Sequence, residues 1–262
     1  MAHPLGAFPD SPWYQAGREI VWIGARLPAL HPRAVMTASA PVRGRELHFE
    51  SVPRCAWSPR LPRPDRAQVA NLFCGARALR KQAARLGTAG GFGALLVGET
   101  PQFPLDRATP LVRALGKAFD AGDPDAVLVA ARPLLGLGAG LTPSGDDLVG
   151  GAIFGRRLAS RADPRWTGIG RKLSREIRSR SHAVSAALFS DLAAGRSFAP
   201  LHELASALAA ADDEAARRAA RSLVAIGHSS GWDMLAGFLI GTGRARVSPR
   251  AMQARELLHR DR

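Results

Sequence analysis

The sequence predicts an α+β protein in which a mixed strand-and-helix region precedes a mainly α-helical one. Short apolar runs that look like strands occur in the first part, residues 1–105. From there to residue 243, apolar residues recur at helical spacing. This helical part contains two glycine-rich turns, each followed by an apolar helix, and we expect these two helices to pair. Residues 244–262 form a basic tail.

The N-terminal region is expected to hold strands, one helix and several irregular stretches. Residues 1–17 are rich in Pro and Gly and are expected to be loosely ordered. A turn is expected at residues 43–45, and the proline-rich residues 53–64 should be irregular. Helical periodicity covers residues 65–86, with Asp65 as the N-cap. The expected strands are residues 20–23, 34–37, 46–52 and, after the glycines at 90–93, residues 94–97.

The C-terminal region is expected to consist of helices that begin at Pro or Asp and end at Gly. Gly122 and Gly195 supply two stops, because a glycine readily takes the left-handed conformation that ends a helix. The expected helices are residues 110–121, 124–135, 148–159, 166–180, 181–194, 200–211, 213–225 and 232–240.

Bulk composition narrows the classes of function. The hydrophobic content of 46% and charged content of 22% are typical of a soluble globular protein, and no apolar run reaches the roughly 20 residues of a membrane span. The start of the chain lacks the pattern of a signal peptide, and Cys55 and Cys74 form no metal-spaced motif, so we expect a cytoplasmic protein. The net charge of +14 comes mostly from dispersed Arg, without a recognisable nucleic-acid module, so nucleic acid is not the expected partner.

The stretch at residues 136–147, GLGAGLTPSGDD, combines a glycine-rich loop with a helix start. Thr142 is a suitable N-cap, and Pro143 suits the first helical position. Free N–H groups at such a helix start favour an anion. Asp146 and Asp147 follow in the first turn and are candidates for a metal ion, Mg²⁺ in particular, or for a proton acceptor. Adjacent residues point about 100° apart on a helix, so only one faces the site; Asp147 is the expected one.

A second turn repeats the first at an offset of 86 residues. Glycines inside an apolar helix cost about 1 kcal/mol each relative to Ala, so close helix–helix contact is the expected compensation. If the two helices run in the same sense, Asp147 and Asp233 share one pocket. Capping alone is the competing explanation for each Ser-Gly-x-Asp motif. The matched pairs are Ser144/Ser230, Gly145/Gly231, Asp147/Asp233, Gly151/Gly237 and Gly155/Gly241.

The candidate site draws on both turns. His228 is a candidate general acid or base, although a histidine there could simply cap the helix. Ser181, His182 and Ser185 could reach the pocket, but ordinary capping is the favoured explanation for them. We therefore expect catalytic roles for Asp147, Asp233 and His228, and anion binding by Gly138, Gly140, Thr142, Ser144, Gly145, Ser229, Ser230 and Gly231.

These two motifs resemble the AllH-like family, which includes a subunit of oxamate carbamoyltransferase. The resemblance rests on residues 138–147 (GAGLTPSGDD) and 227–237 (GHSSGWDMLAG), and it covers residues 130–242. It implies a bacterial cytosolic subunit of purine and allantoin catabolism. The implied reaction is phosphorolysis of oxalurate to oxamate and carbamoyl phosphate, carried out with other subunits.

In the same resemblance, Ser144, Gly145 and Ser230 hold anion oxygens, Asp147 or Asp233 accepts a proton or holds Mg²⁺, and His228 moves a proton. Two other hypotheses remain open at this stage. In the first, the chain is a non-catalytic scaffold or ligand-binding subunit. In the second, it binds nucleic acid and would be retained on DNA in a strongly salt-dependent way.

Overall fold

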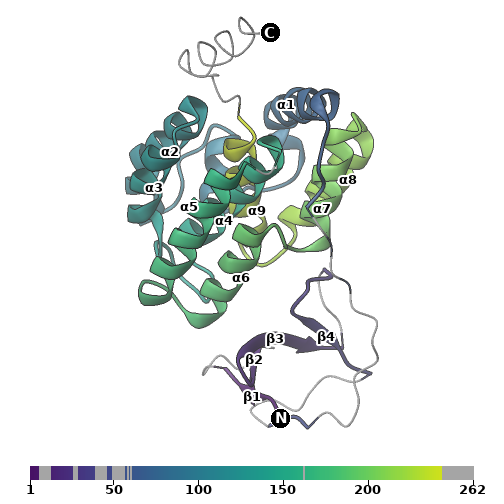
Figure 1. Cartoon of the computed structure of the whole chain (residues 1–262), viewed down its shortest axis with the longest axis vertical. Coiled ribbons are helices and arrows are strands. Elements are labelled where there is room, and N and C mark those ends of the chain that lie inside the picture. The colour runs from purple at the N-terminus through teal and green to yellow at the C-terminus, as the bar shows by residue number, and fades with distance from the viewer. Residues whose placement is uncertain are drawn as a thin grey trace, which may run out of the picture.

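A computed structural model describes residues 1–5, 13–25, 29–38, 46–48, 57, 59, 61–161 and 163–243. It shows a small sheet below a larger helical body (Figure 1). The α+β prediction, with two paired glycine-rich helices, is therefore confirmed. The basic tail at 244–262 and the turn at 43–45 lie outside the described residues. None of the described helices is long and apolar enough to cross a lipid bilayer.

The sheet has four strands in the order β1-β2-β3-β4. The first three pair in antiparallel fashion, β4 runs parallel to β3, and Trp13 stacks on Trp22 across the β2–β3 pair. The prediction of a loosely ordered N-terminus is wrong, because residues 1–17 contain two of these strands. Of the strand expected at 46–52, Leu47 forms only an isolated bridge to Ala2 and residues 49–52 lie outside the described part. The strands are β1 (His3–Pro4), β2 (Trp13–Ala16), β3 (Glu19–Gly24) and β4 (Ala34–Met36).

The first helix and three 3₁₀ helices follow the sheet along the chain. Asp65 caps α1 in a capping box with Gln68, as its sequence predicts. The strand predicted at 94–97 is wrong: this segment belongs to a 3₁₀ helix whose Phe92 and Ala94 are buried. A short apolar run does not by itself separate strand from helix. The elements are α1 (Arg66–Lys81), η1 (Ala83–Arg85), η2 (Gly91–Leu96) and η3 (Leu105–Ala108).

The remaining helices follow the predicted order with small shifts at their ends. The shift that bears on the site is at α4, which begins at Ser144 with Pro143 as its N-cap residue, so Thr142 is not the cap. The elements are α2 (Thr109–Ala121), α3 (Pro124–Ala131), η4 (Arg132–Leu134), α4 (Ser144–Ala159), α5 (Pro164–Glu176), η5 (Ile177–Ser179), α6 (Ala183–Ala194), α7 (Ala199–Ala209), α8 (Asp213–Val224) and α9 (Ser230–Gly241).

Helix α1 packs against α7, and its Leu72 lies in the same core cluster as Leu201 and Leu235. The first helix of the predicted N-terminal region thus contributes to the core of the helical body. The domain division at residue 105 stays a prediction.

The repeat extends beyond the two glycine-rich turns to three helices. Helices α2, α3 and α4 correspond in order to α7, α8 and α9. Gly122 and Ala211, 89 residues apart, both take left-handed backbone conformations between the first two helices of each set. The next residue of each set donates the same turn-closing hydrogen bond, Asp123 to Ala118 and Asp212 to Ala207. The helical body therefore contains two similar sets of three helices, with α4 and α9 in contact at its centre (Figure 1).

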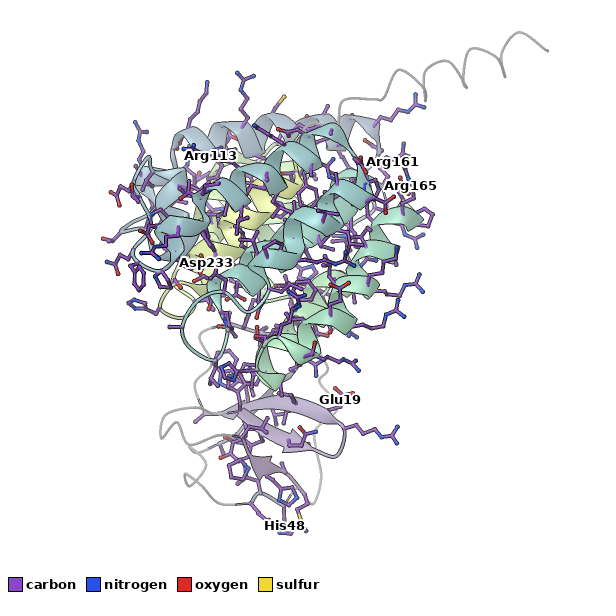
Figure 2. The ribbon with its side chains drawn as sticks, turned by 90° about the vertical axis from the view of Figure 1, so that its left-hand side faces the viewer. Glu19, His48, Arg113, Arg161, Arg165 and Asp233 are labelled. Atoms are coloured by element: carbon purple, nitrogen blue, oxygen red, sulfur yellow. The ribbon has the colours of Figure 1, made fainter. Side chains whose placement is uncertain are left out.

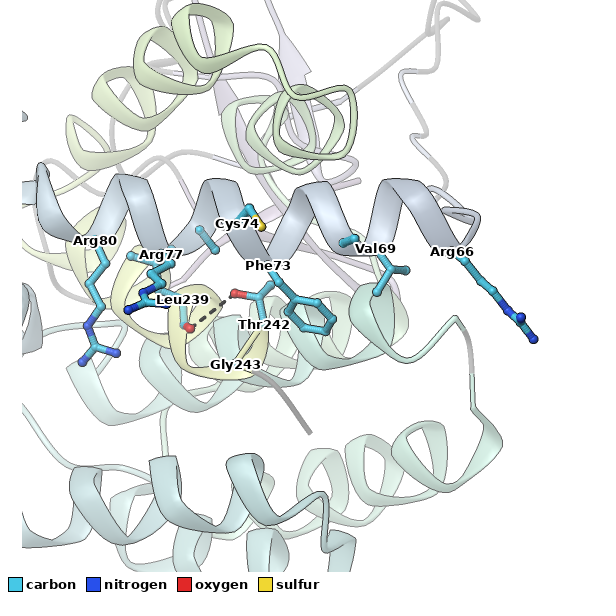
Figure 3. A pocket seen from close by; sticks show the side chains of 11 residues that line it. Arg66, Val69, Phe73, Cys74, Arg77, Arg80, Leu239, Thr242 and Gly243 are labelled. Atoms are coloured by element: carbon cyan, nitrogen blue, oxygen red, sulfur yellow. Dashed lines mark hydrogen bonds between the residues drawn. The ribbon is translucent and has the colours of Figure 1, made fainter. Parts of the chain in front are cut away.

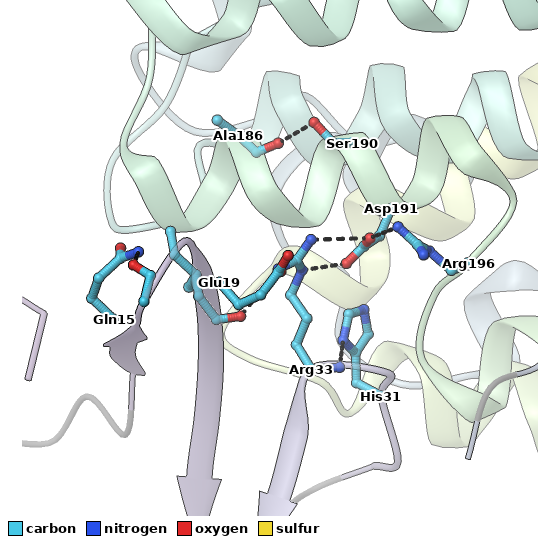
Figure 4. A network of polar contacts seen from close by, with 10 residues as sticks. Gln15, Glu19, His31, Arg33, Ala186, Ser190, Asp191 and Arg196 are labelled. Atoms are coloured by element: carbon cyan, nitrogen blue, oxygen red, sulfur yellow. Dashed lines mark hydrogen bonds and ion pairs between the residues drawn. The ribbon is translucent and has the colours of Figure 1, made fainter. Parts of the chain in front are cut away.

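The sheet is fixed to α6 through Arg33 (Figure 4). The guanidinium group donates to both oxygens of the buried Asp191 and, through Nη1, to Glu19 at 2.9 Å. Arg196 also donates to Asp191, at 2.7 Å. The carboxylate of Asp191 is therefore held by one arginine from the sheet side and one from its own helix end.

We expect Arg33→Ala to destabilise the protein by about 2–3 kcal/mol, because a buried carboxylate loses a charged partner. Glu19→Ala, which removes the exposed partner of the same arginine, should cost less than about 1 kcal/mol. Urea unfolding of the two variants measures both values. Equal small losses would show that Asp191 is satisfied by Arg196 alone.

Candidate functional site

Helices α4 and α9 approach each other so closely that glycine is required at their contact. A Cβ added to Gly237 would lie 1.9 Å from the carbonyl oxygen of Leu148, and one added to Gly151 would lie 2.4 Å from that of Met234. One turn later, Gly155 and Gly241 face Phe238 and Ala152 in the same way. Moving from Gly151 to Gly155 along α4 moves the contact from Met234 to Phe238 along α9. The two helices therefore run in the same direction, and their N-termini lie side by side.

The first turn of each of these helices is hydrogen-bonded to the segment that precedes it. The N–H of Gly145 donates to the Leu137 carbonyl at 2.8 Å, and that of Gly231 donates to the Ile226 carbonyl at 3.0 Å. Both glycine N–H groups are thus used inside the protein, and their predicted role as anion ligands stays a prediction. Within the described part of the chain, the N–H groups of Ser144 and Ser230 make no hydrogen bond.

Gly138 and Gly140 lie in the loop before α4, both in left-handed conformations. A Cβ at Gly138 would lie 2.7 Å from the backbone nitrogen of Ser144, whereas Gly140 is exposed with open space around it. Glycine at position 138 thus leaves the Ser144 N–H uncovered. An uncovered N–H at the first position of a helix is a donor for an anion.

Two pairs of hydroxyl groups join the start of α4 to the start of α9. Thr142 Oγ1 lies 2.9 Å from Ser230 Oγ, and Ser144 Oγ lies 3.4 Å from Ser229 Oγ. In each pair, the first residue of one helix meets the loop that precedes the other helix. The structure therefore brings together all four hydroxyl residues of the predicted anion site.

Asp147 and Asp233 lie buried among these hydroxyls. Their residues are 4% and 0% exposed, and the Oδ2 atom of each has no hydrogen-bond partner among the described residues. Figure 2 shows Asp233 inside the helical body, well away from the sheet. The two side chains therefore lie at adjacent helix starts, where the sequence predicts them. Their role in catalysis stays a prediction.

The two carboxyls have raised pKa values. Burial, together with the charge of Asp233, raises the pKa of Asp147 well above its usual value, and the Ser230 and Thr142 hydroxyls only partly oppose this. Burial also raises the pKa of Asp233 to about 7, opposed by the Phe92 N–H and by Ser144 and Ser229. Because the pKa of Asp147 lies well above its usual value and that of Asp233 is about 7, Asp147 is the carboxyl that keeps its proton while Asp233 ionises near neutral pH.

Asp146 points to a different neighbourhood from Asp147. Its Oδ1 accepts from the Gly136 N–H at 2.7 Å, and its Oδ2 accepts from the hydroxyls of Ser181 and Ser185. Asp146 thus ties the glycine-rich loop to the start of α6, and both serines serve this contact. No group of three or more His, Cys, Asp and Glu side chains in the described ranges is arranged to hold a metal. Mg²⁺ at Asp146 and Asp147 stays a prediction.

A third glycine-rich segment, at the start of η2, completes the site. The Phe92 N–H donates to Asp233 Oδ1 at 2.6 Å. A Cβ on Gly91 would lie 2.3 Å from the same oxygen, and one on Gly90 would lie 3.2 Å from the Ser229 Cβ. The glycine-rich sequence at 90–93 predicts only a break in regular structure, although a run of glycines also permits the close backbone approach seen here.

His228 is exposed, and its side chain makes no hydrogen bond to any described residue. It precedes α9 in the turn that begins at Gly227, whose φ is +64°. Its backbone carbonyl, not its ring, lies beside Gly90. The predicted proton-transfer role of His228 therefore stays a prediction.

A separate groove of about 620 Å³ lies between α1 and the end of α9 (Figure 3). Its apolar floor includes Phe73 and Leu239, and its rim carries Arg66, Arg77 and Arg80. It lies beside Thr242 and Gly243 at the C-terminal end of α9, whereas Asp233 lies in the first turn of that helix. This groove is therefore not part of the carboxyl site.

Comparison with known proteins supports the resemblance seen in the two motifs. A family model described as oxamate carbamoyltransferase subunit AllH matches residues 134–242, which extend from the end of η4 to just beyond α9. The match includes both motifs and both carboxyls, so the resemblance to the AllH-like family is confirmed over these residues. Neither the curated proteins nor the solved structures contain a significant match to this chain.

Proposed function

We propose that this chain is a subunit of an oxamate carbamoyltransferase-type enzyme, which converts oxalurate and phosphate into oxamate and carbamoyl phosphate. One observation carries the proposal: two buried carboxyls with unpartnered oxygens, Asp147 and Asp233, lie at adjacent helix starts within the segment that matches the family. The family name supports a partnership with other subunits. The proposed setting is the bacterial cytoplasm.

The proposed anion site uses the helix starts and not the carboxyls. The free N–H groups of Ser144 and Ser230 carry the positive ends of two helix dipoles, which favour a phosphate or carbamoyl phosphate oxygen. The half-buried hydroxyls of Thr142, Ser229 and Ser230 would exchange their mutual contacts for contacts with substrate. The same donors would stabilise negative charge that develops on the carbamoyl oxygen.

The carboxyl pair supplies the proton transfers that the reaction needs. A phosphate oxygen forms a bond to the carbamoyl carbon, the bond from that carbon to the leaving nitrogen breaks, and the nitrogen takes the electron pair and a proton. Hydrogen phosphate loses its proton in the same reaction. A pair with one protonated and one ionised carboxyl can do both, since one donates to nitrogen while the other accepts from phosphate.

We expect Asp147→Asn and Asp233→Asn each to lower turnover at least about 100-fold in the complex assembled with its partner subunits. Release of carbamoyl phosphate from oxalurate and phosphate is the measurement. Asp213→Asn is the matched control, because Asp213 is also an acid in the first turn of a helix but is exposed. Full turnover in both buried-site variants would exclude a catalytic role for the pair.

A non-catalytic scaffold or ligand-binding subunit is the second candidate. The glycine contacts between α4 and α9 favour it, because they would hold the helices together whether or not the carboxyls react. On this hypothesis the Asn variants assemble normally and retain turnover, while a larger residue at Gly151 or Gly237 prevents folding. Comparing assembly with turnover in the same variants separates the two candidates.

A further inference from the structure

The two halves of the site are similar in their helices and hydroxyls but not in what holds their carboxyls. Each carboxyl faces one hydroxyl from its own loop and one from the first residue of the other helix: Thr142 and Ser230 for Asp147, and Ser229 and Ser144 for Asp233. The segment at the start of η2 contacts only the second half. It gives Asp233 a backbone N–H donor, and among the described residues Asp147 accepts no such backbone hydrogen bond.

We propose that Gly91 and the Phe92 N–H position Asp233 and make it the carboxyl that accepts the phosphate proton, leaving Asp147 to donate a proton to the leaving nitrogen. This inference rests on the proposed function. An N–H aimed at a carboxyl oxygen stabilises the ionised form over the neutral form. At 2.6 Å the Phe92 N–H does this for Asp233. Asp147, which has no such N–H donor among the described residues, then keeps its proton.

Gly91 makes this approach possible. Its φ of +53° turns the chain over the Asp233 carboxyl, and the two oxygens would lie 2.3 and 2.5 Å from an added Cβ. Gly93 is pressed against the ring and Cβ of Trp232 in the same way, which fixes the far side of the segment. The turn and the start of α9 are thus packed as one unit.

Few other charged groups bear on this assignment. Asp146 raises the pKa of Asp147, and its carboxyl is fully bonded to Gly136, Ser181 and Ser185. The segment at 90–93 contributes no charged side chain, and the side chain of His228 is exposed. The Phe92 N–H is therefore the main feature that distinguishes the two halves.

The first test uses the isolated full-length chain with ¹³C-labelled aspartate carboxyls, so it does not depend on activity. In the wild type, the Asp233 resonance should titrate near neutral pH while Asp147 stays protonated there. Gly91→Ala should raise the Asp233 midpoint by about one unit or more, because the added methyl displaces the carboxyl from its N–H donor. Gly98→Ala, another left-handed glycine but with open space around it, should leave the midpoint unchanged. Titration of Asp147 before Asp233, or no shift in Gly91→Ala, would overturn the inference.

The second test measures pH profiles of carbamoyl phosphate release by the assembled complex. Asp233→Asn should remove the acidic limb, which reports an ionised base, whereas the residual activity of Asp147→Asn should retain it. The opposite pattern would reverse the roles and overturn the inference. Absence of the reaction in the wild-type complex would overturn the proposed function alone, because the resonance titration would still decide how the turn positions Asp233.

Discussion

Gly237→Ala should destabilise the protein by more than about 3 kcal/mol, although alanine is the better helix former by about 1 kcal/mol. The added methyl would lie 1.9 Å from the Leu148 carbonyl oxygen and 2.9 Å from the Ala152 nitrogen. Both are backbone atoms of α4, so no side chain can rotate to make room. The helices must separate, and the paired helix starts of the site separate with them. Urea unfolding monitored by circular dichroism gives the loss in free energy of unfolding.

Gly168→Ala is the matched control for this prediction. Gly168 also lies inside a helix, α5, but its Cβ position has nothing within 4 Å. Alanine there should stabilise the protein by about 0.5–1 kcal/mol, through helix propensity and the reduced entropy of the unfolded chain. If both alanine variants were equally stable, the contact between α4 and α9 would be looser than the structure shows.

Local signals in the sequence account for most of the helices. Asp65 with Gln68 forms the capping box of α1, and Gly122 and Gly195 end their helices in left-handed conformations. These signals act within a few residues, so they can be read without knowing the tertiary structure. Strands β1 and β2 have two and four residues, and they gain their stability from pairing and from the contact of Trp13 with Trp22. No local pattern of that length could have predicted them.

The three-helix repeat was only partly visible because the sequence retains it mainly where geometry is strict. Gly151 and Gly237 match because any side chain there would strike the opposite backbone. Helices α3 and α8 need only apolar faces, so their residues diverge. In addition, α3 and α8 are offset by 89 residues but the glycine positions by 86, because the start of α9 follows the start of α8 three residues sooner than α4 follows α3. A search at one fixed offset therefore finds one helix pair and misses the others.

The sequence predicts the side chains that form the candidate site, but not the backbone groups that contact them. Asp147 and Asp233 could be paired because a shared offset and a parallel helix contact together fix where the first turns lie. The contribution of Phe92 is a backbone N–H, which every residue other than proline carries, so its identity gives no signal. Asp146 could not be separated from Asp147 by residue type either; its hydrogen bonds to Gly136, Ser181 and Ser185 separate them.

Asp233→Asn should raise the free energy of unfolding at pH 8. It should also make the free energy of unfolding fall less than in the wild type as the pH rises from acid to neutral. The pKa of Asp233 rises from 3.8 in the unfolded chain to about 7 in the fold, so the fold binds the extra proton between these values. Stability from this group is therefore complete below about pH 4, falls as pH rises, and is lost above about pH 8. A shift of about three units corresponds to about 4 kcal/mol as an upper value.

Asparagine cannot ionise, and its Oδ1 can still accept from the Phe92 N–H, so the variant keeps the contact without the buried charge. Urea unfolding at pH 5 and pH 8 measures the effect as a difference between wild type and variant, which removes contributions from groups common to both. Asp213→Asn should show no such difference, because Asp213 is exposed. If Asp233→Asn and the wild type lost equal stability between the two pH values, Asp233 would already be ionised at pH 5. Burial would then not raise the pKa of Asp233, and this carboxylate would be too weak a base for the proton transfer from phosphate proposed for it.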